Sequence, residues 1–494
     1  MDNPNRFAVT RSLCLWLVLV TILAAGLRLP RLGSWSMWED ELYTARTCSH
    51  LFEVYLSKRL GYVPTAAALW LSGVDPLSIP SEQPEQWRAM GVTEFPMRIA
   101  SCLIGIATIP LLGLAGARLL GARAAGIAAL LLAIAPWHIY WSQAARFYTQ
   151  QFLFYNLALI FYFVATQHGS RPRLVWAMVF AVLGFLSQPP ALVIAAIFAA
   201  DWLIALLRGR PVRLGRSGWL TLIIALGACV VIVGYDIASD VHEWGKLGKP
   251  LGHTPSVLVL GTVWQVTPAL AAFAVLSGLA IWRHHSRLAI YLLLAAVVPA
   301  AVLVIMYLGF ENYVHTRYAF VSLYAWVALA AVGLDRILSW RRADHHASAG
   351  SSLVGWAVIA AVIVPVLVVD FEYFAGGNAW RRRWKEAFAY IEQHRQPGEA
   401  VLAERLDIAR YYLEDADVQR LPGKVENLPP LDRPTWLIAA TESATGKRRY
   451  TFLDDLADLR AYYDVRIVQP FSSIRVYYND GARPAGHDAA AIGR

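Results

Sequence analysis

The stretch RLAIYLLLAAVVPAAVLVIMYL at residues 287–308 sets the fold class of this 494-residue chain. It carries a single charged residue, Arg287, and a helix needs about 20 mostly apolar residues to cross the hydrocarbon core of a bilayer. Comparable apolar blocks occur at residues 12–29, 95–119, 123–140, 147–166, 173–187, 189–207, 217–236, 257–282, 318–339 and 352–370. The sequence therefore predicts a mostly α, polytopic membrane protein with about eleven transmembrane helices.

The composition excludes an ordinary soluble enzyme. Hydrophobic residues make up 57% of the chain and charged residues 16%, whereas soluble domains average about 45–50% apolar and about 25% charged residues. The formal net charge is +9, which in a soluble chain would suggest a nucleic-acid partner. Here the basic residues separate by side of the membrane, so we expect membrane lipids and no nucleic acid as partners.

The basic residues alternate from one connection to the next. Connections on the N-terminal side of the membrane contain Arg6, Arg11, Arg118, Arg123, Arg171, Arg173, Arg208, Arg210, Arg213, Arg216, Arg283, Arg287, Arg336, Arg341 and Arg342. The short connections on the opposite side contain Arg146, Lys246, Lys249 and Arg317. Because Lys and Arg accumulate in cytoplasmic loops, the N-terminus is predicted to be cytoplasmic. The 30–94 loop and everything after residue 371 are predicted to face outward.

The sequence becomes more polar after the last apolar block. A polar helical pattern opens at 380–386, Pro397 and Gly398 break it, and short apolar runs follow at 435–440 and 465–468. We expect residues 371–480 to form a small external soluble α/β domain. Residues 1–370 would form the transmembrane domain, with interfacial helices in the first external loop at 30–94. The segment 481–494, rich in Ala, Gly and Pro, is predicted to be a disordered tail.

Ionisable side chains gather at the predicted external rim of the membrane and almost avoid the centres of the spans. Asp40 and Glu41 follow the first span, and Arg98 begins the second. Arg146 follows the third span, and Arg317 precedes the tenth. Taken singly, an acidic flank is most often solvated and an interfacial Arg usually snorkels to the headgroups. Together, carboxylates and arginines at this boundary suit a reaction of a lipid-borne anionic group.

Five strings in this region resemble bacterial GT-C glycosyltransferases, the relatives of protein O-mannosyltransferases and of the lipid A aminoarabinose transferase. The strings are RLP at 28–30, WEDE at 38–41, FPMRIAS at 95–101, GARAAG at 121–126 and PWHIYWSQAARFY at 136–148. The resemblance is specific over residues 25–165 and mainly topological to 370. It implies a GT-C catalytic domain at 1–370 in a bacterial inner membrane, with the active site on the periplasmic or extracellular face.

The resemblance also implies roles for individual residues. Asp40 would be the general base, because an inverting transfer needs a carboxylate to take the proton of the acceptor hydroxyl. Glu41 would be a helper that orients the acceptor or its partner residues. The leaving phosphate needs fixed cations and donors, and the donor phosphate would be bound by Arg98, Arg146, Tyr148, Arg317 and Tyr318. A hexosyl or pentosyl group would move from a polyprenyl-phosphate sugar to an envelope glycan, lipid or protein, with inversion.

The sequence departs from the family pattern at two places that bear on metal binding. Many relatives carry Glu-Lys-Pro or His-Pro-Pro in the first loop, where this chain has Tyr62–Thr65, and an acidic residue where this chain has Ala144. The predicted external histidines lack metal-ligand spacing; they are His50, His242, His253 and His315. No cofactor is therefore predicted. Binding of a divalent cation, Mg²⁺ or Mn²⁺, by Asp40 and the phosphate oxygens stays an open alternative, since such a cation needs few protein ligands.

Two other functions fit the same spans. A non-catalytic protein that binds a polyprenyl lipid would retain the fold without the chemistry, because fold does not give activity. The departures at Tyr62–Thr65 and Ala144 favour that alternative, whereas the intact Asp40, Glu41 and Arg146 oppose it. A transporter would also need many spans, but charges at mid-membrane depth and broken-helix signals are nearly missing from the sequence. The glycosyltransferase is the primary prediction.

Overall fold

The computed structural model describes residues 10–209, 215–239, 252–282, 286–310, 313–343, 349–375, 380–422, 433–440, 465–471 and 474–480. The chain divides into two compact units. The first, called here the helical unit, comprises Met1–Pro30, Phe52–Thr65 and Arg98–Ala375. The second, the mixed unit, comprises Arg31–Leu51, Ala66–Met97 and Gly376–Arg494. The predicted tail at 481–494 and His242 lie outside the described residues.

The compact units do not follow the predicted division at residue 370. The prediction assigned the whole 30–94 loop to the transmembrane domain, but 31–51 and 66–97 cluster with the C-terminal residues. The reason lies in long-range contacts: Tyr412 accepts a hydrogen bond from the backbone of Met37, and Tyr411 donates one to the carbonyl of Val92. These bonds tie two parts of the loop to the end of the chain.

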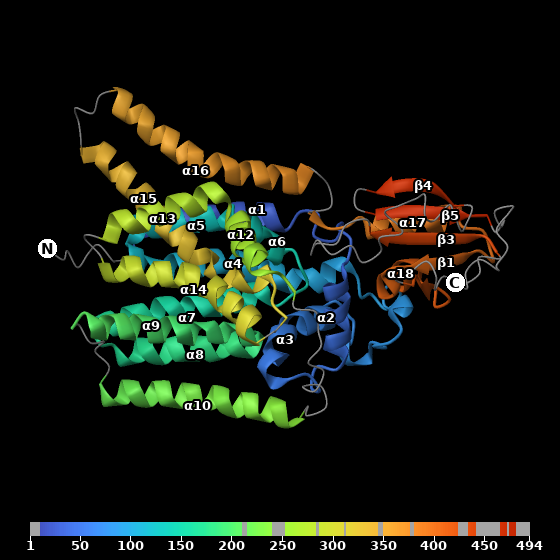
Figure 1. The fold of residues 1–494 in the computed structure, drawn as a ribbon, viewed down its shortest axis with the longest axis horizontal. Helices are drawn as coiled ribbons and strands as arrows, with labels where there is room; N and C mark the ends of the chain where they lie inside the picture. Colours follow the sequence, from blue (N-terminus) through green and yellow to red (C-terminus); the bar gives the residue numbers. More distant parts are fainter. Residues whose placement is uncertain are drawn as a thin grey trace, which may run out of the picture. The chain divides into compact units, whose positions relative to one another are not determined.

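The helical unit is built from helices that pack side by side, most of them long (Figure 1). They are α1 Arg11–Arg28, α5 Ala122–Ala133, α6 Pro136–Ser142, α7 Tyr148–His168, α8 Arg171–Ser187, η4 Pro189–Leu192, α9 Val193–Leu207, α10 Arg216–Ser239, α12 Pro255–Val266, α13 Pro268–Trp282, α14 Ser286–Phe310, η5 Thr316–Ser322, α15 Leu323–Ala343 and α16 Ala349–Ala375. Two further helices, α3 Leu56–Leu71 and α4 Glu94–Leu120, continue from one unit into the other.

Among the described residues, 7 helices are long and apolar enough to cross a membrane, or up to 9 if each bent pair is one span. The chain is thus a multi-pass membrane protein. Helices α7 and α8 lie at two other predicted spans. Helix α8 has 17 residues, and α7 carries Gln150, Gln151 and Asn156, which lower its hydropathy. The count of eleven stays a prediction.

Both bends between paired helices have a local cause. Helix α5 ends at Ala133 and α6 begins at Pro136, whose nitrogen cannot donate the hydrogen bond that would continue α5; the two axes differ by 61°. Helices α12 and α13 meet at 91°, where Thr267 has a φ of 72° and Pro268 follows. Each proline starts a new helix instead of extending the old one.

The mixed unit contains a five-stranded sheet of order β2-β1-β3-β5-β4. Strand β1 (Ala400–Ala403) pairs in parallel with β2 (Gln419–Arg420) and β3 (Thr435–Ala440). Strand β5 (Ile474–Asn479) is antiparallel to β3 and to β4 (Val465–Phe471). The other elements of this unit are α2 Glu39–Ser49, η2 Pro76–Ser78, η3 Pro84–Gln86, α17 Trp384–His394 and α18 Leu406–Leu413. Within the described part of 371–480, helices and strands thus alternate at first.

Candidate active site

The two predicted catalytic carboxylates lie in the first turn of α2. Trp38 precedes the helix in an extended conformation, and Glu41 donates its backbone N–H to the carbonyl of Trp38 at 2.9 Å. Carboxylates are favoured in a first turn because the helix dipole is positive there. Asp40 is half-buried, whereas Glu41 is fully buried. Asp40 is therefore the more accessible of the two carboxylates.

Helix α2 is held at both ends by side chains of the mixed unit. Arg405 contacts both carboxylate oxygens of Glu39, the first residue of α2, with the longer contact at 2.7 Å. In the last turn, Arg46 donates to the carbonyl of Ser81 at 2.8 Å and pairs with Asp407 at 3.3 Å. The backbone of Asp40 therefore has ionic anchors on both sides along the helix.

Arg98 and Arg146 are both buried in the helical unit. Arg98 has no exposed side-chain surface and Arg146 is 7% exposed. Ser101, three residues after Arg98, donates to the carbonyl of Arg146 at 2.9 Å, and Thr149 donates to the carbonyl of Ser101 at 3.2 Å. The two arginines thus lie on segments that are hydrogen-bonded together. Burying a charge costs several kcal/mol unless it is compensated, and such residues inside a membrane unit usually mark a functional site.

Tyr148 begins α7 beside Arg146. The guanidinium carbon of Arg146 lies 4.6 Å from the ring centre of Phe147 and 5.9 Å from that of Tyr148. The ring of Trp141 is 4.2 Å from that of Tyr148 and 6.4 Å from that of Phe320. Since Phe320 belongs to the same short helix as Arg317, this aromatic cluster connects the Arg146 segment with the Arg317 segment.

Arg317 and Tyr318, the late-loop candidates, are half-buried in η5. Here His315 accepts the backbone N–H of Arg317 at 3.2 Å, and its ring stacks 3.7 Å from that of His253. Burial and the charge of Arg317 lower the pKa of His253, and burial, Arg317 and His253 lower the pKa of His315 to about 2. Both imidazoles are therefore neutral near pH 7. Arg317, 5.6 Å from the ring centre of Tyr318, carries the positive charge of this loop.

The structure assigns Arg28 a role that its sequence did not reveal. Its buried guanidinium donates to the carbonyls of Ala133 at 2.8 Å and Leu132 at 3.3 Å, and it lies 2.9 Å from Nδ1 of His138. The last carbonyls of a helix have no partner within it, so Arg28 stabilises the break between α5 and α6. An Arg at the end of a span would be expected to snorkel, which hid this role in the sequence.

Two sets of candidates belong to different compact units. Arg98, Arg146, Tyr148, Arg317 and Tyr318 lie in the helical unit, whereas Asp40 and Glu41 lie in the mixed unit. Among the described residues, no group of three or more His, Cys, Asp or Glu could hold a metal ion.

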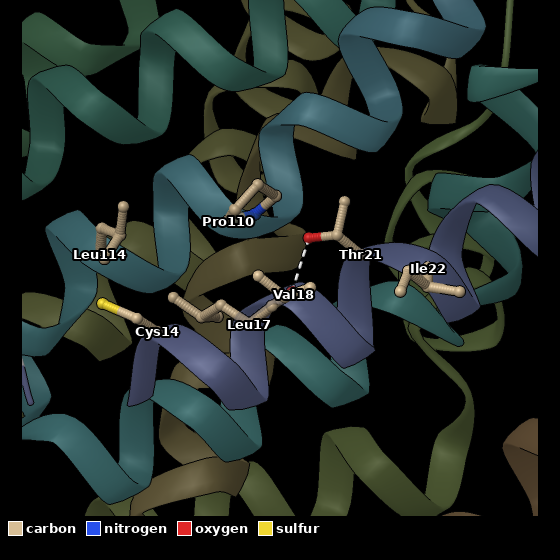
Figure 2. Close-up of a pocket in the computed structure, with 7 residues that line it drawn as sticks. All are labelled: Cys14, Leu17, Val18, Thr21, Ile22, Pro110 and Leu114. Carbon is tan, nitrogen blue, oxygen red and sulfur yellow. Dashed lines mark hydrogen bonds between the residues drawn. The ribbon is translucent and has the colours of Figure 1, made fainter. Parts of the chain in front are cut away.

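A groove of about 410 Å³ lies between α1 and α4 (Figure 2). Its lining comprises Cys14, Leu17, Val18, Thr21, Ile22, Pro110 and Leu114. The hydroxyl of Thr21 donates to the carbonyl of Leu17 at 2.7 Å, and the rest of the lining is apolar apart from the thiol of Cys14. The groove suits an apolar chain but offers no carboxylate or cation for chemistry.

Comparisons with known proteins agree with this architecture. Residues 88–235 match the family model described as dolichyl-phosphate-mannose-protein mannosyltransferase. No curated protein matches the chain. The structure is similar to ArnT from Cupriavidus metallidurans in the apo state, with a TM-score of 0.56 and 15% identity over 94% of this chain and 98% of that chain. For ArnT from the same organism bound to undecaprenyl phosphate, the TM-score is 0.53 and the identity 15%, and the match covers 96% of this chain and 99% of that chain.

A third similar structure comes from an archaeon. It is the oligosaccharyltransferase AglB from Archaeoglobus fulgidus in complex with an inhibitory peptide and a dolichol-phosphate. Its TM-score is 0.53 with 13% identity, and the match covers 83% of this chain and 64% of AglB. The match to the mannosyltransferase model and the similarity to ArnT and AglB confirm the resemblance predicted from the motifs. The chain therefore has a fold like that of ArnT and AglB, two glycosyltransferases, and its residues 88–235 resemble the mannosyltransferase family.

Proposed function

We propose that this protein is an integral-membrane glycosyltransferase that moves one sugar from a polyprenyl-phosphate donor to a hydroxyl of an envelope glycan, lipid or protein. The observation that carries the proposal is the pair of buried arginines in a GT-C fold, Arg98 and Arg146, on segments joined by the hydroxyl of Ser101. Two buried guanidiniums in a membrane unit suit a phosphate ligand. The reaction would take place on the external face of a bacterial inner membrane.

The proposed chemistry is a single inverting displacement at the anomeric carbon. The acceptor oxygen forms the new glycosidic bond while Asp40 takes its proton, and the bond from the anomeric carbon to the phosphate oxygen breaks with its electron pair. The polyprenyl phosphate thus gains negative charge as it leaves. Arg98 and Arg146 would stabilise that charge, which is worth most in a site that excludes water.

The late loop would contribute a third cation. The neutral imidazoles of His253 and His315 leave Arg317 as the charged group of its loop, as their lowered pKa values indicate. Tyr148 and Tyr318 lie beside Arg146 and Arg317 respectively, at 5.9 Å and 5.6 Å from ring centre to guanidinium carbon. They would orient these guanidiniums toward the phosphate and offer hydroxyl groups to it.

The donor is proposed to be a lipid-linked sugar, because a membrane protein offers the apolar surrounding that a polyprenyl tail needs. ArnT, which is similar in fold, has been solved bound to undecaprenyl phosphate, and AglB with a dolichol-phosphate. A sugar on undecaprenyl phosphate is accordingly the first donor to test. The acceptor is proposed only as a class, a hydroxyl presented by a glycan, lipid or protein.

The test is release of free polyprenyl phosphate by protein purified into nanodiscs. A panel of polyprenyl-phosphate sugars is offered to wild type, to Asp40→Asn, and to Glu392→Gln as a matched loss of one exposed carboxylate. Release by wild type and Glu392→Gln but not by Asp40→Asn supports the proposal. Running each assay with and without EDTA decides whether a divalent cation takes part.

Lipid binding without catalysis is the second candidate. It is favoured by the replacement of the family's first-loop string with Tyr62–Thr65 and by Ala144. The same assay separates the two functions, because a non-catalytic protein would bind labelled polyprenyl phosphate but release none from any donor and acceptor pair.

A further inference from the structure

A buried hydrogen-bonded network in the mixed unit joins the start of α2 to the C-terminal part of the chain. At its centre is Tyr412, whose hydroxyl accepts the backbone N–H of Met37 at 2.6 Å and donates to Glu94 at 3.2 Å. Lys385 completes the network with its ammonium 3.0 Å from the same carboxylate oxygen of Glu94. The side chains of Met37, Glu94 and Tyr412 are all at least 95% buried.

The network reaches the segment that leads directly into the predicted catalytic turn. Met37 is followed by Trp38, the residue that caps α2, and Asp40 is the second residue of the helix. A second bond fixes the neighbouring position, because the backbone N–H of Lys385 donates to the hydroxyl of Ser36 at 3.1 Å. Two successive residues before α2 are therefore held by α17 and α18.

Each group in the network leaves its partner little freedom. A tyrosine hydroxyl has one proton to donate, and Tyr412 donates it to Glu94. The hydroxyl oxygen therefore accepts the backbone N–H of Met37 through a lone pair. Glu94 is buried and needs a compensating charge, which Lys385 supplies. The ring of Tyr412 packs 6.2 Å from that of Phe388. On the other side, the guanidinium carbon of Arg88 lies 5.7 Å from the centre of the Tyr412 ring. Tyr412 is thus packed between α17 and the first loop.

We propose that Tyr412, with Lys385 and Glu94, forms a positioning element through which the C-terminal residues fix the α2 turn that carries Asp40. This inference rests on the proposed function for the identity of Asp40 as the base. Tyr412 touches no reacting atom in this scheme. It acts by holding Met37, because a small displacement of a catalytic group is enough to slow a reaction strongly.

The first test compares two substitutions that each remove one tyrosine hydroxyl from the mixed unit. Tyr412→Phe removes both bonds of the central hydroxyl, and Tyr478→Phe removes the bond from β5 to Glu399, at 2.7 Å. We expect Tyr412→Phe to lower kcat about tenfold or more with the KM for donor and the binding of polyprenyl phosphate unchanged. Tyr478→Phe should leave kcat within about twofold of wild type. Equal effects of the two substitutions would overturn the inference.

The second test uses the charge pair. Lys385→Met leaves the carboxylate of Glu94 buried without its ammonium, so kcat should fall at least as far as in Tyr412→Phe. Adding Glu94→Gln removes the uncompensated charge and keeps an acceptor for Tyr412. We expect the double variant to recover most of the lost kcat, whereas a loss that persists in the double variant would contradict the charge-pair mechanism.

A structural readout keeps this inference separate from the proposed function. Hydrogen exchange of the amides at 41–45 reports the order of α2 in protein without substrate. Tyr412→Phe should raise exchange there and Tyr478→Phe should not. If wild type releases no polyprenyl phosphate, the proposed function fails while the exchange result still decides the inference. If wild type is active and Tyr412→Phe changes neither kcat nor exchange, the inference fails alone.

Discussion

The two groups of candidate site residues are anchored in contrasting ways. Arg146 in the helical unit is tied to α4 by Ser101, which lies 45 residues away in sequence, with α5 and α6 between them along the chain. The segment before Asp40 in the mixed unit is tied by Tyr412, which is 375 residues away. Arg146 is thus tied to a nearby part of the chain, whereas the segment before the carboxylates is tied to residues near the other end of the chain.

The comparison teaches which anchors tolerate change. In the helical unit, the anchors are guanidinium and hydroxyl groups bound to backbone carbonyls in a buried setting, as Arg28 is to Ala133. In the mixed unit, one anchor of α2 is an ion pair whose Glu39 side chain is 57% exposed. Removing a buried polar group costs much more stability than removing an exposed ion pair, so the Arg28 anchor and the Glu39–Arg405 anchor should respond differently to substitution.

The largest effect is expected from the base itself. Asp40→Asn keeps the shape of the side chain and removes its ability to take a proton, so kcat should fall by about 10²–10⁴-fold. Binding of polyprenyl phosphate, measured with labelled lipid, should stay near the wild-type value because the cations are unchanged. Full activity of Asp40→Asn in the release assay would show that the base assignment is wrong.

The anchors come next and test the comparison directly. Arg28→Met leaves the carbonyls of Leu132 and Ala133 without this donor, and losing one partner of a buried charged network costs about 3–5 kcal/mol. Arg405→Gln removes an exposed ion pair and should cost less than about 1 kcal/mol. Thermal unfolding midpoints in detergent measure both. Equal midpoints for the two variants would remove the contrast between the units.

A smaller effect is expected at Arg98, one of the two arginines proposed to bind the donor phosphate. Arg98→Gln retains hydrogen-bond donors but loses the charge, so kcat should fall by about 10²–10³-fold, as for removal of one stabilising donor at a developing charge. Donor binding should weaken in parallel, unlike in Asp40→Asn. Measuring both kcat and the binding constant of polyprenyl phosphate in the two variants distinguishes a cation that binds the phosphate from a base that only takes the proton.

The smallest effect concerns pH. Burial and the charge of Arg317 lower the pKa values of His253 and His315 in the fold, the latter to about 2, against about 6.5 in an unfolded chain. Below pH about 6.5 the unfolded state therefore binds more protons. The stability from these neutral imidazoles is complete above that pH and declines as the pH falls toward the folded pKa.

The measurement is the unfolding midpoint at pH 7 and pH 5. The midpoint of wild type should drop on acidification, and that of a His253→Gln, His315→Gln double variant should drop less. Each histidine contributes at most about 1.4 kcal/mol per pH unit, reduced by its partial exposure. An identical drop in both proteins would mean that these imidazoles do not limit stability in acid.

Much of the helical unit was predictable from apolar length. The block at 287–308 lies within α14, and that at 95–119 lies within α4. A long, mostly apolar segment in a membrane satisfies its own backbone hydrogen bonds by forming a helix. The bends were less visible. The block at 123–140 comprises α5 and α6 at 61°, and Pro136 was the signal in the sequence for that break.

The candidate site was predicted as a set of residue types and not as an arrangement. Motifs in the sequence identified Asp40, Glu41 and Arg146, and their roles stay proposals. The functions of Arg28 and Tyr412 as anchors were not predicted, because their partners are backbone groups of segments remote in sequence. A backbone N–H or carbonyl leaves no mark in the amino-acid pattern, so such contacts are evident only after folding.

Hydropathy and charge along the chain were enough to predict a multi-pass membrane protein whose charged residues avoid the centres of its spans, because both are properties of local sequence. That Arg31–Leu51 and Ala66–Met97 pack with the C-terminal residues became evident only in the folded protein. The full burial of Arg98 did so too. Those outcomes depend on which distant segments meet, and that is settled by the packing of the whole chain.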